Sequence, residues 1–82
     1  LNANNEITVG HKRKRQFQSA LYNFVTDCRA GNPWSYEDLA HTLGLYSYYH
    51  MVEPEAIDGI VLHFNQKHQV DVLRMMKDAM TT

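Results

Sequence analysis

Apolar residues recur with helical spacing over the first third of the chain. The face begins at Phe17 and continues at intervals of three and four residues, through Phe17, Ala20, Leu21, Phe24, Val25 and Cys28. This spacing places every member on one side of an α-helix. Gly31 and Pro33 end the helix, because glycine suits the left-handed position after a helix and proline cannot continue one. The start is left open: the basic run either precedes the helix as an arm or lies in the second turn of a helix beginning near Thr8.

A second, shorter helix is predicted within the stretch Ser35 to Leu45, and Leu45 follows directly after the helix has ended. Ser35 is a favourable N-cap, and Glu37 and Asp38 place negative charge at the positive end of the helix dipole. Gly44 is expected to stop the helix. A capped helix closed by glycine is typical of the first helix of a helix-turn-helix, and it is equally typical of any tight helical corner.

The second half of the chain predicts further helices. The segment 46–52 fits either a short helix or an irregular aromatic stretch. Pro54 opens the next helix at its first position, followed by the apolar face Ile57, Ile60, Val61 and Phe64. A terminal amphipathic helix is predicted from about Val70 to Met80.

A β-hairpin over residues 60–73 is the alternative for this region. Asp58 and Gly59 form a turn signal, and two short apolar runs flank four polar residues. A hairpin there would make the fold a winged helix. We prefer helices because Arg74 to Met80 is rich in helix formers.

These elements predict an all-α protein, a compact bundle of four to five short helices containing a helix-turn-helix-like corner. Residues 1–10 are polar and asparagine-rich and are expected to form a flexible tail, and residues 11–82 a single domain with a basic arm at 11–15. The predicted core consists of Phe17, Leu21, Phe24, Val25, Cys28, Trp34, Leu39, Leu43, Ile57, Ile60, Val61, Phe64, Leu73 and Met76.

Charge is distributed unevenly along the 82 residues, although the formal net charge is only −1. The segment 11–15 holds four of the eight basic residues, and acids outnumber bases from Arg29 onward. The molecule is therefore a basic segment on a mildly acidic body. Such a segment can bind the phosphates of a nucleic acid, bind an acidic protein, or simply be exposed to solvent.

Candidate chemistry is sparse. The single Cys28 lies on an apolar face, so it is expected to be inert, and it suits a reducing, cytoplasmic location. The five histidines lack ligand-like spacing, so neither a metal nor a cofactor is expected. No nucleophile motif or phosphate-binding loop is visible, which argues against an enzyme and a small-molecule substrate. No apolar run approaches the ~20 residues of a membrane span.

The sequence therefore favours a small regulatory or adaptor module that binds another protein. Tyrosine offers large apolar area with a polar tip, so the expected surface is Tyr46, Tyr48, Tyr49, His50 and Met51. The alternative is a DNA-binding transcription regulator with a divergent helix-turn-helix. Its contacts would be Lys12, Arg13, Lys14 and Arg15 of the basic arm together with Ser47. Homodimerisation is a third arrangement.

Overall fold

The computed structural model describes residues 9–81, and this part of the chain folds into four α-helices with no strand. The helices are α1 (His11–Arg29), α2 (Tyr36–Val52), α3 (Pro54–His68) and α4 (Val72–Thr81). The expected all-α bundle is confirmed. The predicted tail over 1–10 lies outside the described residues except for Val9, which is buried, and Gly10.

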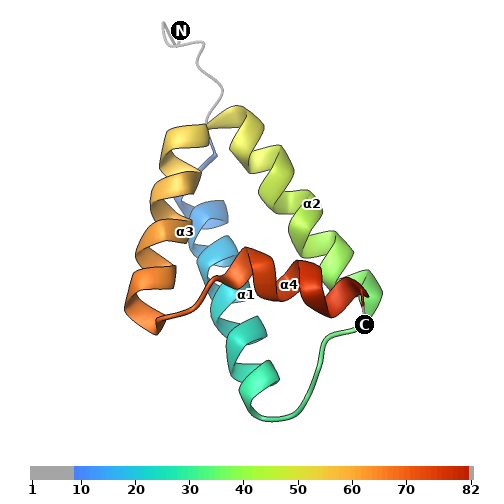
Figure 1. Cartoon of the computed structure of the whole chain (residues 1–82). Helices are drawn as coiled ribbons and strands as arrows, with labels where there is room; N and C mark the ends of the chain where they lie inside the picture. Colours follow the sequence, from blue (N-terminus) through green and yellow to red (C-terminus); the bar gives the residue numbers. More distant parts are fainter. Residues whose placement is uncertain (1–8, 82) are drawn as a thin grey trace, which may run out of the picture.

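Helix α2 is the central element of the bundle. It contacts each of the other three helices. Figure 1 shows α2 and α3 diverging from their junction, with α4 crossing the front of the molecule. Because α2 has neighbours on several sides, it carries apolar residues around much of its circumference.

Local signals at the helix ends behave as expected. The Oγ of Ser35 accepts a hydrogen bond from the backbone N–H of Asp38 at 3.2 Å, and Pro54 begins α3. Gly31 adopts φ +82° directly after Ala30, the C-cap residue of α1. Helix α1 starts at His11, so the basic residues Lys12 to Arg15 belong to the helix itself.

The predicted stop at Gly44 is wrong, and the helix-turn-helix-like corner expected there is not confirmed. Helix α2 continues through Gly44 to Val52 without a left-handed residue. Its buried side runs past the glycine, from Leu39 and Thr42 before it to Tyr49 after it. Packing along this side outweighs the ~1 kcal/mol that glycine costs inside a helix.

Replacing Gly44 with alanine is expected to stabilise the protein by about 0.5–1 kcal/mol, because a helical Cβ there meets open space. Urea unfolding measures the change. Gly31→Ala is the opposite control: it also has room for a Cβ, but its positive φ strains alanine, so it should destabilise. Destabilisation by Gly44→Ala would mean that α2 is broken at this residue.

The hairpin alternative over 60–73 is also wrong. Helix α3 extends to His68 with Ile57, Val61 and Phe64 buried on one side. Gln69 then adopts φ 56° and ends the helix. Asn65 bridges to α4, since its side-chain oxygen accepts from the N–H of Val72 at 3.0 Å. This bond ties the beginning of α4 to α3 and fixes the turn between them.

The hydrophobic core lies where the four helices meet. Its buried members are Val9, Phe17, Leu21, Phe24, Val25, Leu39, Tyr49, Ile57, Val61, Phe64, Val72 and Met76. Val9, Tyr49 and Val72 were not predicted. Five predicted members are only half-buried and pack around this cluster: Cys28, Trp34, Leu43, Ile60 and Leu73.

Candidate functional site

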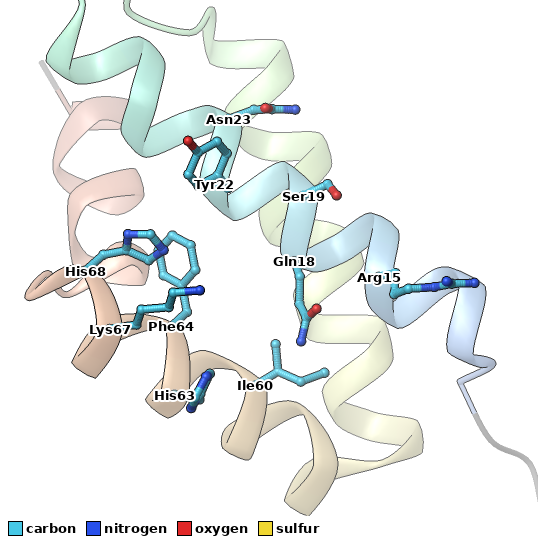
Figure 2. Close-up of a pocket in the computed structure, with 10 residues that line it drawn as sticks. All are labelled: Arg15, Gln18, Ser19, Tyr22, Asn23, Ile60, His63, Phe64, Lys67 and His68. Carbon is cyan, nitrogen blue, oxygen red and sulfur yellow. The ribbon is translucent and has the colours of Figure 1, made fainter.

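A groove runs between α1 and α3. It comprises two adjoining cavities of about 510 and 610 Å³, which share Arg15, Gln18 and Ile60. We call it the α1–α3 groove, lined by His11, Lys14, Arg15, Gln18, Ser19, Tyr22 and Asn23 of α1 and by Ile60, His63, Phe64, Lys67 and His68 of α3. Figure 2 shows the cavity of about 510 Å³ with the residues that line it.

The helical repeat explains why polar residues collect in the groove. Residues Arg15, Gln18 and Tyr22 follow one another at three- and four-residue intervals, beside the stripe that α1 buries in the core. In Figure 2, Gln18 and Tyr22 extend toward α3. Ile60 and Phe64 supply the apolar part of the lining from α3.

All the charged side chains lining the groove are cations. Lys14, Arg15 and Lys67 contribute permanent positive charge, and three histidines add protonatable rings. No aspartate or glutamate is among the lining residues of either cavity. A concave surface lined by one sign of charge concentrates the electrostatic field and attracts counter-charged ligands. The groove is therefore suited to an anion.

Glu53 holds one end of the groove in place. Its carboxylate accepts the backbone N–H of Val9 at 2.6 Å and lies 3.2 Å from Nζ of Lys14. The hydrogen bond from Val9, followed by that from Lys14, lowers the pKa of Glu53. Since Glu53 is the single residue between α2 and α3, these contacts join the start of α1 to that junction.

Removing the charge of Glu53 is expected to make the protein less sensitive to acid. A carboxylate with a lowered pKa in the folded state stabilises above its unfolded-state pKa of about 4.3, and this contribution is lost as pH falls through the folded-state pKa. Glu53→Gln should therefore lower the urea midpoint at pH 6, and the difference from the wild type should shrink as the solution is acidified below about pH 4.

Glu37→Gln is the matched control, because the exposed Glu37 side chain makes no hydrogen bond or ion pair within residues 9–81 and acts only on the dipole of α2. An equal loss of stability by Glu53→Gln at pH 6 and pH 3 would show that the charge of Glu53 contributes nothing to the contact.

The predicted protein-binding residues are divided between core and surface. Tyr49 is buried, with its ring edge-on to Phe17 at 6.0 Å between centroids. Tyr46 is half-buried and stacks on the same phenylalanine at 6.2 Å. His50 is half-buried, and its Nε2 lies 3.0 Å from Oδ1 of Asp58.

Tyr48 and Met51 remain exposed, with 54% and 82% of their surface accessible. Burial, and secondarily the charge of Asp58, raises the pKa of Tyr46, as expected for a tyrosine that serves packing. The five-residue aromatic surface is thus reduced to two well-exposed side chains.

The predicted nucleic-acid residues are also divided. Lys14 and Arg15 line the groove, whereas Lys12 and Arg13 are exposed outside its lining. Ser47 is exposed on α2 and takes no part in the groove.

Sequence reasoning missed the groove residues that follow the basic run and those of α3. The missed polar, basic and aromatic residues are Gln18, Ser19, Tyr22, Asn23, His63, Lys67 and His68. The polar stripe of α1 was readable from its helical spacing, but the placement of α3 beside it was not.

Other kinds of site find no support among the described residues. Within residues 9–81, no three His, Cys, Asp or Glu side chains are grouped to hold a metal ion. Cys28 is half-buried, and burial together with the charge of Asp27 raises the pKa of its thiol, which disfavours the reactive thiolate. In the same part of the chain, no helix combines the length and apolarity that crossing a membrane requires.

No protein-family model matches this chain, and neither the curated proteins nor the solved structures contain a match.

Proposed function

We propose that this protein binds nucleic acid through the α1–α3 groove. The observation that carries the proposal is a groove whose charged lining residues are Lys14, Arg15 and Lys67, in a chain whose net charge is −1. Lys14 is already paired with Glu53, so Arg15 and Lys67 are the principal cations offered to a ligand. Cations gathered in one groove neutralise phosphates and release counterions, which drives nucleic-acid binding. The proposal needs no helix-turn-helix, because α1 and α3 themselves supply the groove.

The length of the groove favours a polyanion over a small anion. From His11 to Asn23, α1 rises by roughly 18 Å at 1.5 Å per residue. A nucleic-acid strand carries one phosphate per ~3.4 Å of helix axis, so about five phosphates of one strand fit this length. Gln18, Ser19 and Asn23 add neutral groups that donate hydrogen bonds to phosphate and sugar oxygens.

Titration of a fluorescent 20-nucleotide strand at several salt concentrations tests the proposal. We expect saturable binding at 50 mM salt, with an affinity that falls steeply and linearly on logarithmic axes as salt increases. The absence of saturable binding at low salt, or an affinity independent of salt, would contradict it.

Protein–protein binding by a regulatory or adaptor module is the second candidate. Tyr48 and Met51 favour it, because they are exposed neighbours one turn apart on α2. They lie on α2 and outside the groove lining, so both functions can coexist in one molecule. If the surface joins two copies of the chain, sedimentation should depend on concentration, and Tyr48→Ser with Met51→Ser should remove that dependence.

A further inference from the structure

We propose that the α1–α3 groove takes single-stranded nucleic acid, with an unpaired base stacked on Tyr22. This inference rests on the proposed nucleic-acid binding and adds to it the class of strand and the side chain that selects it.

Tyr22 is a large aromatic residue left open at the groove. Tyr22 is 53% exposed although it lines the cavity of about 510 Å³. The ring centroid lies 5.8 Å from that of His68, with the planes tilted by 56°, so the two rings are not stacked face to face. Tyr22 therefore offers ring surface to a ligand.

Neighbouring side chains support the ring and define one aromatic end of the groove. His68 packs against Phe64 with 4.3 Å between centroids, and Phe64 is buried. Figure 2 shows Tyr22 reaching from α1 toward His68 and Phe64 on α3. We call Tyr22, His68 and Phe64 the aromatic platform. Because Phe64 anchors it in the core, the platform changes little when a base is placed on it.

An unpaired base satisfies this arrangement better than a duplex does. In a double helix both faces of each base are covered by its neighbours, whereas an unpaired base can stack on an aromatic side chain. Such stacking tolerates any base, because every base has a π-face. The platform thus selects single strands without selecting a sequence.

Cations lie on both sides of the platform. Lys67 is adjacent to His68 in α3, and Arg15 precedes Tyr22 by seven residues, or about 10 Å along α1. Phosphates on either side of the stacked nucleotide can therefore reach a positive charge. Asn23, next to Tyr22, carries an amide that can bond to a base edge or sugar.

Three ligands with labelled ends separate stacking from charge. They are a 20-nucleotide oligothymidine, a strand of equal length composed of abasic sites, and a 20-base-pair duplex, each measured by fluorescence anisotropy at the same series of salt concentrations. Oligothymidine and the abasic strand carry the same phosphates, so only the bases differ. The wild type should bind oligothymidine several-fold more tightly than the abasic strand.

Tyr22→Ala should weaken oligothymidine binding by about fivefold or more, the effect of losing one stacked base. Its binding of the abasic strand and the duplex should stay within twofold, and Tyr22→Phe should behave like the wild type. Tyr48→Ala is the matched control, because Tyr48 is 54% exposed but lies on α2 away from the groove. Urea unfolding of each variant checks that the fold is retained.

Equal wild-type affinities for oligothymidine and the abasic strand would overturn the stacking proposal, as would a loss by Tyr22→Ala that is the same for all three ligands. If all three ligands bind equally and with steep salt dependence, the groove still binds phosphates and stacking alone is refuted. If none binds at low salt, the nucleic-acid function itself fails and the stacking proposal fails with it.

Discussion

Leu21→Ala is expected to lower the free energy of unfolding by about 2–5 kcal/mol, the largest effect of a single substitution predicted for this protein. Leu21 is 0% exposed and lies in the middle of α1. Removing most of its side chain loses buried apolar area and leaves a cavity that the surrounding helices close only in part. A domain of 82 residues has little stability to spare, so the variant should be partly unfolded at 37 °C.

Leu62→Ala provides the control for this substitution. Leu62 is also a leucine within a helix, but 58% of its surface is exposed. The same chemical change should therefore alter stability by less than about 0.5 kcal/mol. Urea or thermal unfolding followed by circular dichroism measures both variants. Similar losses for the two leucines would mean that α1 does not pack through Leu21.

The helix ends were predictable because each depends on a few neighbouring residues. The Ser35 cap, the proline at the start of α3 and the glycine after α1 all act through backbone groups within one turn. The helical spacing of apolar residues likewise identified the buried side of α1. Local chemistry decides these features, so the sequence suffices to recognise them.

Gly44 shows where local reasoning fails. A glycine after a short capped helix is typical of a helix end. Only the contacts of α2 with the other helices make it more favourable for α2 to continue through Gly44. Tyr49 was assigned to the surface for a related reason. Its neighbours in the chain suggested an exposed aromatic segment, whereas its position against Phe17 depends on how α1 crosses α2.

The groove illustrates the same limit for the candidate site. Lys14 and Arg15 were recognisable as members of a basic run, but Lys67 is distant in sequence and was not connected to them. The tertiary arrangement of α1 and α3 brings these cations to one groove. It also adds Tyr22, which the sequence alone gave no reason to separate from the other tyrosines.

Neutralising two groove cations together, Arg15→Gln with Lys67→Gln, should weaken binding of a single strand by roughly 65-fold at 50 mM salt. Each lost phosphate contact lowers the logarithmic salt slope by about 0.7 on single strands, so two contacts lower it by about 1.4. If the variant and the wild type bind equally at 1 M salt, a slope lower by about 1.4 over the roughly 20-fold decrease to 50 mM salt gives the stated loss of affinity. Anisotropy titrations between 50 and 300 mM salt measure both the affinity and the slope.

The pair Arg74→Gln with Lys77→Gln separates a local effect from net charge. Both residues are exposed on α4 and lie outside the groove lining, so this variant loses the same two positive charges without changing the groove. Its salt slope should match that of the wild type, because the removed cations contact no phosphate. Equal losses of affinity and slope in the two double variants would show that binding follows overall charge, and the α1–α3 groove would then not be the binding site.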